Sequence, residues 1–163
     1  MSNLLGAVIV TMFLAPGRPP DSCLVPLGQL QGKANAIEWY FFQGTRELTV
    51  FVVPQTSLPA GEREVTLAWS YPYTEPSMIW FRVDVLCAGS TNLIELILTH
   101  EAVHLAHPSY THDEVDALVR TYHPTRFEAY QAELKTIGGR AAAWRYQNRH
   151  WLARATSYPG PPQ

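Results

Sequence analysis

Residues 100–104 read His100-Glu101-Ala102-Val103-His104, so two histidines lie four positions apart with a glutamate beside the first. On an α-helix, side chains four positions apart share one face and lie about 6 Å apart along the axis. Two such imidazoles can bind one metal ion, and the neighbouring glutamate can hold a water molecule bound to that ion. The spacing predicts a Zn²⁺ site with His100 and His104 as ligands and Glu101 as general base.

The segment that carries this motif is predicted to be a buried helix. Ser90 or Thr91 can cap its N-terminus, and Pro108 stops it after about Ala106. The segment is apolar nearly all round, as helices in a protein interior are. Its apolar residues are Leu93, Ile94, Leu96, Ile97, Leu98, Val103 and Leu105.

The histidines of the motif continue a core-facing line on this helix, because His100 and His104 follow Leu93 and Ile97 at helical spacing. Buried imidazoles need polar partners, and a buried Glu101 needs one even more. A metal ion would satisfy these groups together. The alternative is a pair of core histidines that hydrogen-bond to the backbone.

The first 88 residues favour a sheet. Runs of β-branched and aromatic residues alternate with turn residues, and the connection 43–46 has the length of a hairpin loop. Apolar and polar side chains alternate in the later runs, as in strands with one wet face. We therefore expect a mostly antiparallel sheet of four to five strands. The predicted strands are 7–14, 36–43, 47–53, 64–71 and 78–86.

After Gly89 the pattern becomes helical. Thr111-x-x-Glu114 is a capping box that opens a second helix over about 113–122. Pro124 fits the first turn of a third helix, which would run to Ile137 and end at Gly138-Gly139. A fourth helix would cover 140–155, before a Pro-rich tail at 156–163. The expected fold class is α+β in one domain, a sheet-rich half 1–88 followed by about four helices in 89–155.

Composition indicates one soluble globular domain of 163 residues, cytoplasmic or part of a particle rather than secreted. Cys23 and Cys87 have no metal or redox spacing, so a reduced pair in the core is expected, with one disulfide as the alternative. The apolar stretch 4–17 resembles a secretory signal, but no positive charge precedes it. We expect it to be a retained strand that is too short to cross a membrane.

The motif on a buried helix that follows a sheet resembles the zincin metallopeptidases, over the motif itself and the order of elements in residues 36–137. The resemblance implies that His100 and His104 bind zinc and that Glu101 polarises the zinc-bound water. In the metzincin branch the motif continues with a glycine and a third histidine, where this chain has His107 and Tyr110. The chain is therefore more similar to the gluzincin branch, which takes its third ligand from a glutamate on a later helix.

The resemblance to gluzincins implies a third zinc ligand in the last part of the chain. Glu128 is preferred because aromatic residues flank it and indicate partial burial, whereas Glu133 has the setting of an exposed acid. The Asn-Glu pair of thermolysin-like enzymes is absent, since Phe127 precedes Glu128. Asp113 and His112 stay open as alternatives.

The expected reaction is peptide-bond hydrolysis. Zinc would lower the pKa of a bound water toward about 7, and Glu101 would take its proton and return it to the leaving amine. An oxyanion stabiliser is also required, for which His123 is the first candidate and Tyr110, Tyr122 and Tyr130 are the others. In zincins the strand before the helix commonly lines the cleft, which here would be 78–86, and a substrate could pair with that edge.

The leading hypothesis is a small zinc metallopeptidase that acts on a peptide or protein substrate. A second is a zincin-like component of a larger assembly such as a phage virion or toxin complex, with or without catalysis, because the chain is rich in apolar and aromatic residues that could meet protein partners. Nucleic-acid binding through the basic segment 138–154 is disfavoured, since that segment matches no known module.

Overall fold

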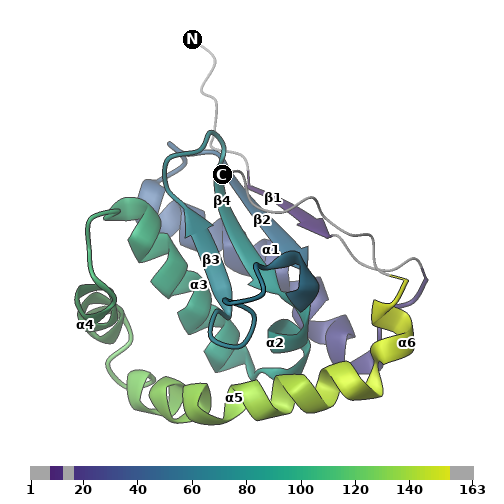
Figure 1. Cartoon of the computed structure of the whole chain (residues 1–163). Helices are drawn as coiled ribbons and strands as arrows, with labels where there is room; N and C mark the ends of the chain where they lie inside the picture. Colours follow the sequence, from purple (N-terminus) through teal and green to yellow (C-terminus); the bar gives the residue numbers. More distant parts are fainter. Residues whose placement is uncertain (1–7, 13–16, 155–163) are drawn as a thin grey trace.

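The computed structural model describes residues 8–12 and 17–154 (Figure 1). The ends of the predicted strand 7–14, residue 155 and the Pro-rich tail at 156–163 lie outside the described residues. In Figure 1, helix α1 (Asp21–Phe42) lies behind the sheet and helix α5 (Phe127–Gln147) runs along its lower end.

The sheet has four strands in the order β1-β2-β4-β3. β1 (Val8–Met12) pairs in parallel with β2 (Leu48–Val53), and β2 pairs in parallel with β4 (Ser77–Arg82). β3 (Ala68–Tyr71) pairs antiparallel with β4 and forms one edge. The α+β class is confirmed, but the sheet is mixed, so the prediction of a mostly antiparallel sheet is wrong.

Helix α1 explains why β1 and β2 are parallel. The predicted strand 36–43 is the last part of this helix, whose buried positions Leu30, Ala34, Glu38 and Phe42 repeat every four residues. The helix carries the chain back along the sheet, as a parallel connection requires. It ends at Gln43 in the left-handed region, with φ of 52°, so the connection 43–46 joins a helix to a strand and not two strands of a hairpin.

Two other predicted strands are shorter than expected. Residues 78–82 belong to β4, and residues 83–86 belong to helix α2 (Val83–Ala88). Nearly all of this segment is buried, so its alternation of residue types does not mark a strand with one face in solvent. In 64–71 only β3 is a strand. The preceding residues form a loop that begins with the 3-10 helix η1 (Gln55–Ser57).

Helix α3 (Thr91–Ala106) and helix α4 (His112–Tyr122) confirm the predicted helices and their caps. The Ser90 hydroxyl accepts a hydrogen bond from the Leu93 N–H at 3.1 Å, and Thr111 and Glu114 form the capping box. The two predicted C-terminal helices are one helix, α5, followed by α6 (Arg149–Leu152).

Gly138 and Gly139 do not end α5, although glycine costs about 1 kcal/mol in a helix interior relative to alanine. Both glycines are exposed, whereas Ile137, Ala141 and Trp144 on the same helix are buried. Burial of these side chains offsets the low helix propensity of the glycines.

Cys23 and Cys87 form a disulfide that joins α1 to α2, so the prediction of a reduced pair is wrong. Their Cα atoms are 4.6 Å apart, within the range that a disulfide spans. Sequence spacing could not show this, since the two cysteines meet only when α1 packs against α2 beside the sheet.

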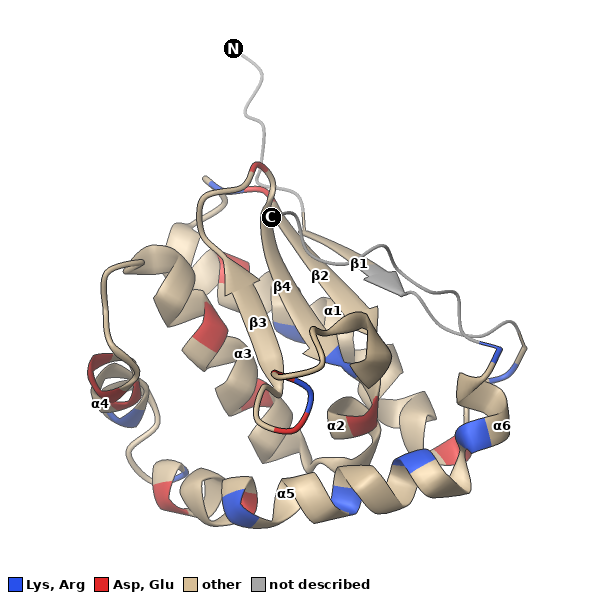
Figure 2. Cartoon of the chain, viewed as in Figure 1, with Lys and Arg blue, Asp and Glu red and all other residues tan. Residues whose placement is uncertain are grey.

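The basic residues of the C-terminal segment lie along α5 and α6 (Figure 2). Two of them are already paired, Arg140 with Glu133 at 3.0 Å and Arg145 with the buried Asp84 at 2.5 Å. Within the described part of the chain, no helix has both the length and the apolar character needed to cross a membrane.

Candidate functional site

Three histidines converge at the end of α3. His100 and His104 lie one turn apart on this helix, as their spacing predicts, and their Nε2 atoms are 3.1 Å apart. His112 joins them from α4, and one ligand nitrogen from each of the three lies within 4.8 Å of the others. We refer to His100, His104 and His112 as the histidine cluster.

The position of His112 follows from the start of α4. Thr111 is the N-cap, so His112 is the first residue of the helix, and the short connection from α3 turns the chain back toward His100. The His112 ring stacks on the His100 ring with centroids 5.4 Å apart, and its centroid is 4.9 Å from that of His104. His112, one of the alternative ligands that the sequence left open, is brought to the motif by the fold.

Asp116, one turn after His112 on α4, orients His100. Its Oδ1 lies 3.0 Å from His100 Nδ1, and Gln131 Nε2 donates to its Oδ2 at 3.4 Å. A carboxylate at Nδ1 holds the proton there and leaves Nε2 free to bind a metal. Asp116 was not among the candidates from the sequence, although its spacing of four from His112 within a capped helix was a usable signal.

The histidine cluster has the properties of a metal site. Burial, together with the neighbouring His100 and His112, lowers the pKa of His104 to about 4. Burial also lowers the pKa of His100, against the opposing effect of Asp116. Both rings are therefore neutral at neutral pH, which is the form that binds metals. Nitrogen ligands of a tetrahedral metal site lie about 3.3 Å apart, and the ligand nitrogens of the cluster lie within 4.8 Å of one another, so the three histidines could hold one metal ion.

Glu101 lies next to the cluster in a buried position. The Ser70 hydroxyl, on β3, donates a hydrogen bond to its carboxylate. Only 7% of Glu101 is exposed, and this burial raises its pKa to about 7, while the bond from Ser70 opposes the rise. A carboxyl group with a pKa near neutrality can both accept and return a proton.

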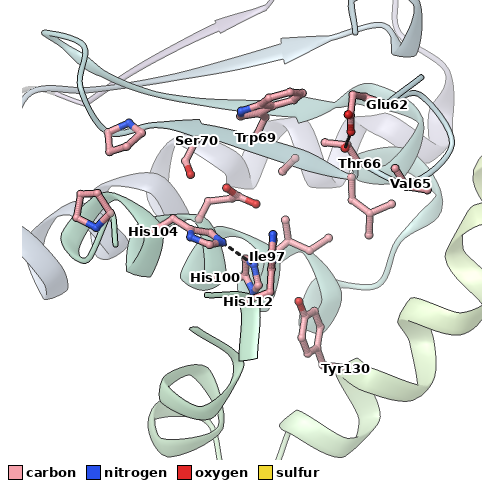
Figure 3. A pocket seen from close by; sticks show the side chains of 15 residues that line it. Glu62, Val65, Thr66, Trp69, Ser70, Ile97, His100, His104, His112 and Tyr130 are labelled. Atoms are coloured by element: carbon pink, nitrogen blue, oxygen red, sulfur yellow. Dashed lines mark hydrogen bonds between the residues drawn. The ribbon is translucent and has the colours of Figure 1, made fainter. Parts of the chain in front are cut away.

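The histidine cluster and Glu101 line one cleft of about 740 Å³ (Figure 3). β3 forms the opposite wall, with Ala68, Trp69 and Ser70 among the lining residues. The prediction that 78–86 lines the cleft is wrong, because β4 lies between β2 and β3 and is not an edge. The edge strand that faces the motif is β3.

Tyr130 enters the same cleft from the first turn of α5. It is only 3% exposed, and burial raises the pKa of its phenol, with further contributions from the negative charges of Asp116 and Glu101. The hydroxyl therefore stays protonated and can donate a hydrogen bond. Among the oxyanion candidates from the sequence, Tyr130 is the one that lines the cleft.

Glu128, the preferred third ligand, is not brought to the histidine cluster. Its side chain is 79% exposed and pairs with Arg120 at 3.2 Å. The reason is helical geometry, since Phe127 and Tyr130 share the buried face of α5 whereas Glu128 lies about 200° around the helix from Tyr130. Aromatic neighbours in sequence therefore did not indicate burial of Glu128.

The other acids considered as ligands also lie elsewhere. Glu133 accepts hydrogen bonds from the Ser90 backbone N–H and hydroxyl and pairs with Arg140. Asp113 is exposed and is not part of the histidine cluster.

His123 lies outside the cleft. Its Nε2 is 3.3 Å from Thr99 Oγ1, and it lines a separate cavity of about 350 Å³ between α1 and α3 together with Tyr122. Tyr110 stacks on His107, with ring centroids 4.5 Å apart, and does not line the cleft. The structure therefore does not place His123, the first oxyanion candidate, near Glu101.

Comparisons with family models, curated proteins and solved structures find no match to this chain. The resemblance to zincins stays a prediction that the motif alone supports. The function must be inferred from the geometry of the cleft.

Proposed function

We propose that this protein is a zinc-dependent peptidase whose site is the cleft between α3 and β3. The observation that supports this most is the convergence of three histidines with a buried glutamate, Glu101, at the edge of a sheet. His100, His104 and His112 would hold the zinc ion. Three protein ligands would leave one position for water or substrate, as in catalytic zinc sites.

The chemistry that a bound zinc ion supplies is Lewis acidity, which lowers the pKa of a water toward about 7 and polarises a carbonyl oxygen. Glu101 accepts a proton from the attacking water at a carboxylate oxygen and passes it to the nitrogen of the leaving amine. The Tyr130 hydroxyl donates a hydrogen bond to the oxygen on which negative charge develops. Asp116 keeps the His100 ring in the orientation that the site needs.

β3 suits a peptide substrate because it is an edge strand that runs along the cleft. An extended peptide can pair with the backbone of such an edge and become an additional strand. This pairing would place a scissile carbonyl between β3 and α3, beside Glu101. A peptide therefore fits the cleft better than a compact small molecule.

The test combines metal analysis with cleavage of a mixed peptide library. The wild type should contain close to one zinc ion per chain and cleave peptides, and Glu101→Gln should keep the zinc and lose cleavage by roughly a hundredfold or more. Glu128→Gln is the matched control, because Glu128 is exposed on α5 and outside the cleft. A metal-free wild type, or a fully active Glu101→Gln variant, would refute the proposal.

An assembly role is a second candidate, favoured by exposed apolar residues on α1. Trp39 and Tyr40 are each 62% exposed, and Val25 on the same helix is 63% exposed. Large apolar side chains on a surface often mark a protein interface. Light scattering should show an oligomer that Trp39→Ser and Tyr40→Ser disrupt, and a monodisperse wild-type monomer argues against self-assembly.

A further inference from the structure

The charged side chains that line the cleft are of one sign, apart from the histidines. Glu62 and Glu101 are the two carboxylates among the described lining residues, and none of those residues is a lysine or arginine. Glu101 has its partner in Ser70 and its role beside the histidine cluster. Glu62 has no part in the proposed reaction, so its presence in the cleft wall needs another explanation.

Glu62 is held in place by the turn that precedes β3. Its N–H donates to the Pro59 carbonyl at 2.9 Å, and its own carbonyl accepts from the Thr66 N–H at 3.0 Å. The Thr66 hydroxyl donates to one carboxylate oxygen, Oε2, at 3.1 Å. Among the described residues, the other oxygen has no hydrogen-bond partner and no cation pairs with the group. The structure therefore presents an oriented carboxylate with one oxygen available to a ligand.

Two arginines, Arg63 and Arg82, donate hydrogen bonds to the turn and do not pair with Glu62. Arg63 donates to the carbonyls of Leu58 and Thr56 at 2.9 and 3.1 Å. Arg82 donates to the carbonyls of Arg63 and Thr66 at 2.6 and 3.0 Å, and it pairs with Asp84. Because these guanidinium groups are already used, the negative charge of Glu62 remains for a partner in the cleft.

Glu62 lies at one end of the cleft, with Val65 and Thr66, whereas Ser70 and His104 lie toward the other end (Figure 3). A peptide paired with β3 would pass Glu101 and extend to Glu62. A carboxylate at the wall of a groove that no lysine or arginine lines attracts positive charge and selects for it.

We infer that Glu62 is a specificity residue that selects peptides with an ammonium or guanidinium group at a fixed distance from the scissile bond. This inference rests on the proposed function. The cation has two sources with the same chemistry, a lysine or arginine side chain and the free N-terminus of the peptide, and the substrates below distinguish them.

The experiment uses zinc-loaded protein and a panel of fluorogenic peptides of one length. The panel carries lysine, arginine, norleucine or glutamate at each position in turn, with either an acetylated or a free N-terminus. The wild type should prefer lysine or arginine over norleucine at one position by about tenfold in kcat/KM. In Glu62→Gln this ratio should fall to near one, and Glu62→Lys should favour glutamate at the same position.

Glu64→Gln is the matched control, since Glu64 is an exposed acid two residues away that does not line the cleft, and this variant should keep the ratio. A preference for free over acetylated N-termini that Glu62→Gln abolishes would assign the cation to the N-terminus. Cleavage without any cation preference, or a preference that survives in Glu62→Gln, overturns the inference and leaves the proposed function intact. A wild type that cleaves no peptide in the panel overturns both.

Discussion

Nδ1 of His100 lies 3.0 Å from Oδ1 of Asp116, and this contact links the motif helix α3 to α4. The same turn of α4 carries His112, so one helix supplies both a candidate ligand and the group that orients another ligand. The cluster therefore depends on how α4 packs against α3. Gln131 of α5 extends the network to the helix that carries Tyr130.

Asp116→Asn should weaken zinc binding roughly 10- to 100-fold, because an orienting carboxylate fixes the ring and raises the basicity of the ligand. Competition with a chromophoric chelator measures this affinity. Asp116→Ala should lose more than Asp116→Asn, since the asparagine oxygen can still accept from Nδ1–H. Asp113→Asn, an exposed neighbour on the same helix, is the control. Unchanged affinity in Asp116→Ala would show that the contact has no role in metal binding.

The third ligand is decided by comparing His112→Ala with Glu128→Ala. The loss of one of three protein ligands should lower the bound zinc well below one ion per chain after dialysis, whereas removal of an exposed ion pair on α5 should not. Atomic emission spectroscopy of the dialysed proteins gives the number of zinc ions bound per chain, and circular dichroism verifies that each variant is folded. Full zinc in His112→Ala with loss in Glu128→Ala would restore the ligand that the sequence favoured.

The motif residues were predictable because a helix places residues four apart on one face whatever the rest of the chain does. The caps Ser90 and Thr111 were also predictable, since they depend on a few neighbouring residues. The positions of His112 and Glu128 relative to the motif could not be predicted, for a different reason. Their positions depend on how α4 and α5 fold back on α3, and no local pattern records that packing.

Two predicted strand segments were wrong because buried segments lack a regular alternation of apolar and polar residues. Residues 36–43 and 83–86 are rich in apolar residues, and such a run does not distinguish a strand from a helix that packs on several sides. The pair of histidines and the glutamate on α3 could be anticipated from one helix, whereas the edge strand β3 and the disulfide partner of Cys23 required the tertiary fold.

The metal-free protein should show a pH-dependent stability that Glu101 causes. Burial raises the pKa of Glu101 from its ordinary value of 4.5 to about 7, so the folded state binds this proton more tightly than the unfolded state. The contribution is fully present below pH 4.5 and is lost as the pH rises through 7. Relative to Glu101→Gln, the wild type should therefore lose up to roughly 3 kcal/mol in free energy of unfolding between pH 4.5 and 8.

Urea unfolding at a series of pH values, with a chelator present, measures this difference. The histidines have lowered pKa values and act in the opposite direction, since their contribution is lost as the pH falls below 6.5. Both proteins carry these histidines, so their effect cancels in the comparison. A difference that does not vary with pH would mean that Glu101 is not buried as the structure has it.

Tyr130 and His123 offer a direct test of which group stabilises the oxyanion. Tyr130 lines the cleft with its protonated hydroxyl, whereas His123 lies in the separate cavity beside Thr99. Tyr130→Phe removes only the hydroxyl and should lower kcat about 10²-fold with little change in KM or bound zinc, because the hydrogen bond strengthens in the transition state. His123→Gln should keep kcat within about twofold, since a group outside the cleft makes no contact with the reacting carbonyl. Steady-state kinetics on one cleavable peptide measures both variants, and a large loss of kcat in His123→Gln with none in Tyr130→Phe would reverse the assignment.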